Sequence, residues 1–66
     1  MRRRNEAWLT WTGHIDANQR CFVCGRSKAE LVWLDDGGLF VWAMWAHRDC
    51  AEDYFRRREV KIHVKG

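Results

Sequence analysis

Two short segments decide the fold that this sequence predicts: Cys21-Phe22-Val23-Cys24-Gly25 and, further along the chain, His47-Arg48-Asp49-Cys50. Read as a pattern, they give C-x2-C-x22-H-x2-C. Two residues between donors allow one tight turn, or one helical turn, to direct both side chains at the same ion. Thiolate sulfur and imidazole nitrogen are donors that tetrahedral zinc prefers. The pattern therefore predicts one zinc ion, held by Cys21, Cys24, His47 and Cys50.

The predicted zinc site is structural rather than catalytic. Four protein donors close the coordination shell, whereas a catalytic zinc keeps three donors and a water. The sequence has neither the H-x-E segment that zinc deaminases carry before their Cys pair nor a second His-Asn-His set of the kind in HNH nucleases. We therefore expect no enzymatic activity. His14 and His63 are expected to be solvated, with His14 as the alternative to His47 if the chain folds otherwise.

The size and cysteine content fit this interpretation. The chain has 66 residues, 47% of them hydrophobic, and three cysteines. A single domain of this size, residues 1–66, commonly needs a metal ion to be stable. An odd cysteine count disfavours a disulfide framework, and reduced thiols predict a cytoplasmic location, or a nuclear one in a eukaryote. The longest apolar run, Leu39 to Ala46, is too short to span a membrane.

The segment before the first cysteine pair predicts a terminal strand. Residues 1–5 should form a flexible basic tip. From Glu6 to Ile15, alternation would place Leu9 and Trp11 on one face of a strand. A short helix is the alternative here, and Gly13 should end either element.

A hairpin is predicted between the two ligand pairs. The β-rich runs Leu31–Leu34 and Leu39–Trp42 flank Asp35-Asp36-Gly37-Gly38, and Asp-Gly between two such runs is a strong hairpin signal. Trp33 and Trp42 are expected to pack in the core and around the metal.

The second ligand pair should open a helix that runs from His47 to about Glu59. Acidic residues lie near its start and arginines near its end, which suits the helix dipole. His47 and Cys50 are three residues apart, so they share one face of the first turn. Beyond the helix, apolar and polar residues alternate from Val60 to Lys65, which predicts a half-buried terminal strand.

Cys21 to Gly25 should form a zinc knuckle, the tight turn that wraps the metal. The order of this knuckle, the hairpin and the ligand-bearing helix resembles the treble-clef zinc fingers, such as the GATA-type fingers. The resemblance covers Cys21 to about Arg58, with Cys21 and Cys24 matching the knuckle pair. His47 and Cys50 match the helix pair, although GATA-type fingers have Cys at the place of His47 and a shorter gap. The H-x2-C pair also resembles half of a LIM domain, without that family's second metal site. The resemblance implies a small zinc-stabilised α+β domain with a knuckle, a hairpin, one helix and terminal strands.

The surface chemistry suggests a polyanionic partner. The formal net charge is +3, and arginine, which suits phosphate recognition, dominates the basic residues. The sequence therefore predicts nucleic-acid binding, with Trp8 and Trp11 as stacking groups. The candidate phosphate contacts are Arg2, Arg3, Arg4, Arg26, Lys28, Arg56, Arg57, Arg58, Lys61 and Lys65.

Two features support a different partner. Glu52 and Asp53 stand four residues before Arg56 and Arg57, so ion pairs within the helix would neutralise part of the arginine run. Five tryptophans are also too many for so small a core to bury. The alternative function is therefore a protein-interaction module, such as a transcription-associated or virus-encoded adaptor. In both cases we expect no membrane association, and a monomer or weak homodimer.

Overall fold

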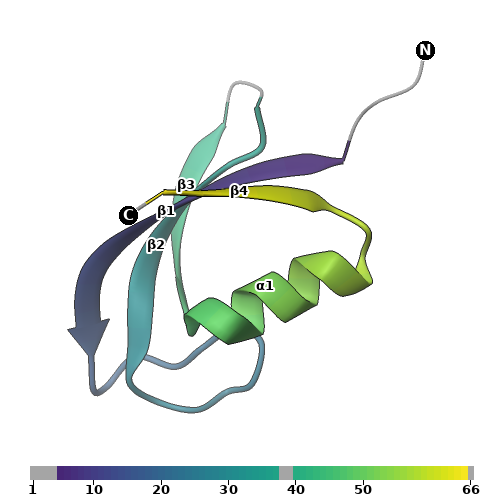
Figure 1. Ribbon diagram of the computed structural model, residues 1–66. Coiled ribbons are helices and arrows are strands. Elements are labelled where there is room, and N and C mark those ends of the chain that lie inside the picture. The colour runs from purple at the N-terminus through teal and green to yellow at the C-terminus, as the bar shows by residue number, and fades with distance from the viewer. Residues whose placement is uncertain (1–4, 38–39, 66) are drawn as a thin grey trace.

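The computed structural model describes residues 5–37 and 40–65. The elements are β1 (Glu6–Asp16), β2 (Ala29–Asp35), β3 (Val41–Ala46), α1 (Arg48–Arg57) and β4 (Lys61–Lys65). The strands form one sheet in the order β3-β2-β1-β4, in which β4 runs parallel to β1 and the other neighbours are antiparallel (Figure 1). This is the small α+β fold that the sequence predicted. The basic tip with Arg2, Arg3 and Arg4, as well as Gly38 and Leu39, lies outside the described residues.

Strand β1 follows the predicted alternation. Ala7, Leu9 and Trp11 are buried, while Thr10 and Thr12 are exposed on the other face. The segment is therefore a strand, and the helical alternative is wrong. The reason is that β1 pairs on both sides, with β2 and with β4, so both rows of its backbone groups are satisfied within the sheet.

Gly13 does not end β1, contrary to the prediction. Its φ of +82° accompanies an irregularity in the pairing between Trp11 and Ile15, after which the strand continues to Asp16. A residue without a Cβ adopts this backbone conformation at little cost, and the bend is a bulge rather than a stop. The Gly13 N–H donates to the Glu30 carboxylate at 2.8 Å, which fixes the bend against β2.

The predicted hairpin is confirmed as β2 and β3. The strands pair antiparallel from Glu30 opposite Ala46 to Asp35 opposite Val41. In the turn, the Asp35 carboxylate accepts the Gly37 N–H at 2.7 Å. The second strand ends at Ala46 rather than Trp42, because pairing with β2 continues up to the ligand-bearing segment at His47.

Helix α1 lies across one face of the sheet, and the core forms between them (Figure 1). Ala51 and Phe55 of the helix are buried there, together with Leu9 and Val32 of the sheet. No helix of the described ranges is long and apolar enough to cross a membrane.

Trp33 and Trp42 are not core residues, so the prediction for both is wrong. Trp33 is 46% exposed, because it alternates with the buried Val32 and Leu34 and therefore points away from the helix. Trp42 is 41% exposed although it lies on the helix side of the sheet, opposite Leu34. It belongs to the outermost strand, and the helix leaves that part of β3 uncovered.

The helix is shorter than predicted, with His47 at the N-cap and Arg58 at the C-cap. Asp49 in the first turn and arginines in the last turn agree with the expected charge order. The chain turns at Glu59, whose φ is +58°, and continues into the predicted last strand. Ile62 of that strand is half-buried, whereas Val64 near its end is exposed.

Candidate metal centre and open sheet face

The four predicted ligands come together in space. The donor atoms of Cys21, Cys24, His47 and Cys50 all lie within 4.8 Å of one another. The first two belong to the loop between β1 and β2, His47 follows β3, and Cys50 lies in the first turn of α1. The cluster therefore brings together side chains from three segments of the chain.

The loop around the first pair forms the tight turn that the sequence predicted. The Gly25 N–H donates to the Cys21 carbonyl and the Cys21 N–H donates to the Arg26 carbonyl, both at 2.9 Å. Gly25 has a φ of +77°, which a residue lacking a Cβ adopts without strain. The turn closes on itself and points both thiols to the same side.

Backbone N–H groups also point at the sulfur atoms. Cys21 Sγ accepts from the N–H of Val23 at 3.3 Å and of His47 at 3.5 Å, and Cys24 Sγ accepts from the N–H of Arg26 at 3.5 Å. Burial raises the pKa of Cys21, but N–H donors from Cys24, His47 and Val23 outweigh it and lower the pKa to about 6. Such donors stabilise a thiolate, which is the form that binds metal.

The pKa of Cys50 shifts in the opposite direction from that of Cys21. Burial raises the pKa of the Cys50 thiol, and the neighbouring Cys24 and Cys21 sulfurs raise it further, to about 12. Several thiolates gathered without a cation repel one another. A divalent cation at the centre reverses this, because a coordinating thiol loses its proton outright.

The orientation of the His47 ring defines its tautomer. Nε2 lies 3.1 Å from the Ser27 carbonyl oxygen, which can only accept a hydrogen bond, so Nε2 carries the proton. Nδ1 faces the thiols, 3.3 Å from Cys24 Sγ and 3.9 Å from Cys50 Sγ. The Ser27 carbonyl, followed by the Cys24 thiol, raises the pKa of His47. In the neutral ring, the free lone pair of Nδ1 is directed into the cluster, as in metal-binding histidines whose other nitrogen is held by a carbonyl.

The spacing between His47 Nδ1 and the thiols of Cys24 and Cys50 fits a tetrahedral ion, whereas the full donor set spreads over as much as 4.8 Å, wider than the roughly 3.8 Å between two zinc-bound sulfurs. Zinc–sulfur bonds of about 2.3 Å and zinc–nitrogen bonds of about 2.0 Å place sulfur and nitrogen donors about 3.5 Å apart. The two sulfur–nitrogen distances to His47, 3.3 and 3.9 Å, lie on either side of this value. The group of three cysteines and one histidine can therefore hold one metal ion.

An ion pair between buried Glu30 and half-exposed Arg48 lies next to the cluster, and the sequence did not predict it. Arg48 donates to the two carboxylate oxygens of buried Glu30, from Nε and Nη2, both at 2.9 Å. The Arg48 guanidinium also lies over the Trp11 ring, 5.4 Å from its centre. This arrangement fixes the residue between His47 and the helix. The available signal was a lone acidic residue at a core position of β2.

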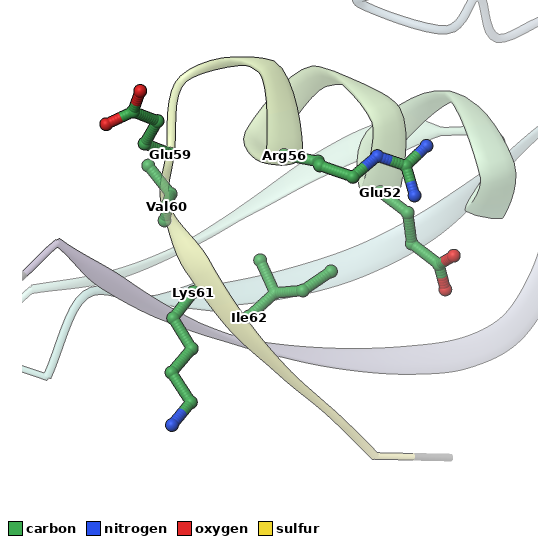
Figure 2. A pocket seen from close by; sticks show the side chains of 6 residues that line it. All are labelled: Glu52, Arg56, Glu59, Val60, Lys61 and Ile62. Carbon is green, nitrogen blue, oxygen red and sulfur yellow. The ribbon is translucent and has the colours of Figure 1, made fainter.

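The arginines at the end of α1 do not form a free basic cluster. Arg56 and Arg57 contact Asp53 at 3.2 and 2.9 Å, so Arg56 pairs with Asp53 where the sequence predicted Glu52. The Arg58 guanidinium stacks over the Tyr54 ring at 3.9 Å. The hollow beside the helix end, shown in Figure 2, is lined by acids and bases together: Glu52, Arg56, Glu59 and Lys61, with Val60 and Ile62.

The basic residues predicted near the knuckle, Arg26 and Lys28, lie on a different part of the surface from the arginines at the end of α1. Arg26 and Lys28 are exposed and line an open hollow together with Asp49 and with three of the candidate ligands, Cys24, His47 and Cys50. His14 is exposed, as expected, with its ring 5.7 Å from that of Trp45. The cluster uses His47 and not His14.

Trp11 is only 4% exposed, so the prediction that it stacks on a base is wrong. It lies on the covered face of β1, whereas Trp8 lies on the other face and stacks on His63 with ring centres 4.9 Å apart. His63 was expected to be solvated but is half-buried, because this stacking and the approach of its Nε2 to Glu6 at 3.7 Å cover it.

The sheet face opposite α1 is exposed over much of its area, and we call it the open face. One row crosses all four strands in register: Ala43, Trp33, Thr10 and Lys65. All four of these side chains are exposed. The neighbouring row contains Val41, Asp35, Trp8 and His63. Trp33 was missed as a surface residue, because its alternation with Val32 and Leu34 places it on the opposite face from them but does not say which face the helix covers.

Comparison of the chain with known protein families, with curated proteins and with solved structures gave no match. The resemblance to treble-clef fingers is therefore a likeness in the order of ligands and elements. Any function has to be argued from the site and the surface themselves.

Proposed function

We propose that the three cysteines and the histidine hold one structural zinc ion in a treble-clef-like frame. Support comes from the order of knuckle, hairpin and helix, from the N–H groups aimed at sulfur, and from the direction of His47 Nδ1. Bound there, zinc supplies a cross-link between the knuckle and the start of α1. Four protein donors leave no open position, so the proposed role excludes catalysis by the metal.

We further propose that the open face binds single-stranded nucleic acid. The observation that carries this proposal is the position of Trp33. It is 46% exposed and lies between the small side chains of Ala43 and Thr10 in the central row. Because its neighbours are small, the Trp33 indole is accessible from the solvent side of the open face. An exposed aromatic ring on a sheet is a surface on which an unstacked base can stack.

The charges around Trp33 agree with this partner. Lys65 is exposed at the end of the same row, and Lys61 is exposed further along β4. The acids of this face have partners of their own, since Asp35 accepts the Gly37 N–H and Glu6 approaches His63. Lysines beside aromatic rings suit a phosphate backbone that passes stacked bases.

A single strand fits better than a duplex. Bases inside a duplex are stacked on one another and do not offer a free face to Trp33. Reading a duplex groove with a helix would need an exposed helix with free basic side chains, whereas Arg56 and Arg57 at the end of α1 contact Asp53.

The test is a titration of a fluorescently labelled random single-stranded oligonucleotide at two salt concentrations. Trp33→Ala should weaken binding roughly 5- to 150-fold, since one stacked base contributes about 1–3 kcal/mol. Trp42→Ala is the matched control, because Trp42 is exposed to a similar degree, 41%, on the opposite side of the sheet. Lys65→Ala should reduce the salt dependence by about one phosphate contact. Equal losses for Trp33→Ala and Trp42→Ala, or no binding at low salt, would contradict the proposal.

A second candidate function, a protein-interaction module, is favoured by one observation. Phe40, Val41 and Trp42 follow one another along the chain and are exposed by 69%, 56% and 41%. Exposed apolar residues in such a group commonly mark a protein contact. This candidate would stand alone if single-stranded nucleic acid failed to bind.

A further inference from the structure

The outer edge of β3 differs from an ordinary edge strand. In the sheet that the described residues form, β3 has a neighbour on one side only, β2 (Figure 1). The segment Phe40–Ala46 contains no charged residue and no proline. Edge strands are usually protected from further pairing by such residues or by bulges. The pairing of β3 with β2 is regular along its whole length, so this edge lacks that protection.

One hydrogen bond shows which backbone groups point outward. The Phe22 N–H, in the knuckle, donates to the Trp45 carbonyl at 3.0 Å. The backbone of Trp45 therefore points away from β2, and because direction alternates along a strand, the backbone groups of Ala43 and Val41 point outward as well. The knuckle occupies the edge at Trp45. Among the residues that the structure describes, none donates a backbone hydrogen bond to the edge from Val41 to Ala43 or accepts one from it.

We propose that a second copy of this chain pairs with this edge, antiparallel and centred on Trp42. Val41 of one copy then lies opposite Ala43 of the other, and each such pair exchanges both backbone hydrogen bonds. Trp42 lies opposite Trp42 in the closer, non-hydrogen-bonded position, where aromatic cross-strand pairs contribute most. A pairing centred on Ala43 would instead place Val41 opposite Trp45 and meet the knuckle.

The match of this segment to itself favours a second copy over an unrelated strand. On the helix side, Phe40 meets Met44 and Trp42 meets Trp42, and on the open face Val41 meets Ala43. Every contact joins apolar groups, no like charges face each other, and the arrangement closes with two-fold symmetry. The two open faces would then lie on the same side of one continuous sheet.

The contact area predicts a weak dimer. The exposed parts of Phe40, Val41 and Trp42 amount to roughly 300 Å² of side-chain surface in each copy, given the usual areas of such side chains. A standard stable interface buries about 800 Å² on each partner. We therefore expect a dissociation constant in the micromolar range or above, with monomers and dimers exchanging.

Sedimentation velocity of the zinc-loaded protein, from about 10 μM to about 1 mM, tests the proposal. The protein should change from monomer to dimer across this range, and Val41→Lys should raise the dissociation constant at least about tenfold, because it places a charge on the edge. Val64→Lys is the matched control, since Val64 is 48% exposed on β4, the opposite edge strand. A protein that stays monomeric throughout, or equal effects of the two substitutions, would overturn the proposal.

Amide hydrogen exchange distinguishes this edge from any other dimer contact. In the proposed dimer the Ala43 N–H is bonded to the second copy, so its exchange should slow as protein concentration rises, and Val41→Lys should abolish that dependence. A dimer in which the Ala43 exchange rate does not depend on concentration would use another surface, and the proposal would be wrong. Neither measurement involves nucleic acid, so both are independent of the function proposed for the open face.

Discussion

At the scale of single residues, Glu30 is the charged side chain that the core has to accommodate. It is buried, and its carboxylate accepts hydrogen bonds from both Arg48 nitrogens and from the Gly13 N–H. A buried carboxylate is tolerated only when its lone pairs are satisfied in this way. Through Arg48, the same group also fixes the residue that follows the His47 ligand.

Replacing this carboxylate by an amide should be costly. Glu30→Gln leaves Arg48 without its charged partner, and we expect the free energy of unfolding to fall by about 1–2 kcal/mol. This is the lower part of the usual range for charged hydrogen bonds, because the Arg48 side chain is 51% exposed. Urea unfolding of both proteins at pH 7, in excess zinc, measures the difference. An unchanged midpoint would contradict this role.

The effect of Glu30 should depend on pH with a defined sign. The Arg48 guanidinium holds the pKa of the Glu30 carboxyl below its usual range. The carboxylate therefore stabilises the fold fully above the ordinary Glu pKa of about 4.3, and this contribution disappears as pH falls through the lower pKa of the folded state. The difference in unfolding free energy between wild type and Glu30→Gln should be largest at neutral pH and narrow in acid. Because both proteins carry the same metal ligands, acid release of metal affects both alike, and a difference that widened in acid would refute the assignment.

At the scale of elements, the end of α1 is a helix stop formed without glycine. The Glu59 N–H bonds to the Arg56 carbonyl and the Val60 N–H to the Phe55 carbonyl, with Glu59 at a φ of +58°. This is the Schellman arrangement, whose left-handed position is usually glycine. For a residue with a Cβ, that conformation is about 1–2 kcal/mol less favourable than the right-handed one.

Glu59→Gly should therefore stabilise the protein, by about 0.5–1 kcal/mol once the greater freedom of glycine in the unfolded chain is subtracted. Glu52→Gly, at an exposed position inside the helix, is the control and should destabilise by about 1 kcal/mol. Thermal unfolding of the two variants beside the wild type checks both signs. A loss of stability in Glu59→Gly would mean that the Glu59 side chain contributes more than its backbone costs.

The helix and strands were largely predictable from the sequence, whereas the contacts between them were not. Ligand spacing, alternation in β1, the Asp-Gly turn and the charge order of α1 predicted the strands, the hairpin, the helix and the grouping of the four donors, because each is a local signal. Trp33 and Trp42 were misplaced because alternation defines which side chains share a face, not which face a single helix covers. The Glu30–Arg48 pair joins β2 to α1, a contact that no local pattern encodes.

At the scale of the whole molecule, the arrangement of α1 on the four-stranded sheet determines which surfaces are buried and which are exposed. Within the described ranges, α1 covers only one face of the sheet, so the open face and the β3 edge are available for partners (Figure 1). The group of three cysteines and one histidine brings the knuckle next to the start of α1, where the proposed metal ion would link the two. In a chain of 66 residues, such a link would supply a constraint that a small core lacks.

The central claim is that one zinc ion, bound by Cys21, Cys24, His47 and Cys50, holds this fold together. Native mass spectrometry of the purified protein tests it most directly, with His47→Ala and the matched variant His14→Ala measured beside the wild type. The account predicts one zinc per folded chain in wild type and in His14→Ala, and a largely metal-free, more highly charged and hence unfolded His47→Ala. A wild-type chain that keeps its compact charge state without metal, or a His47→Ala protein that retains zinc as well as His14→Ala does, would contradict it.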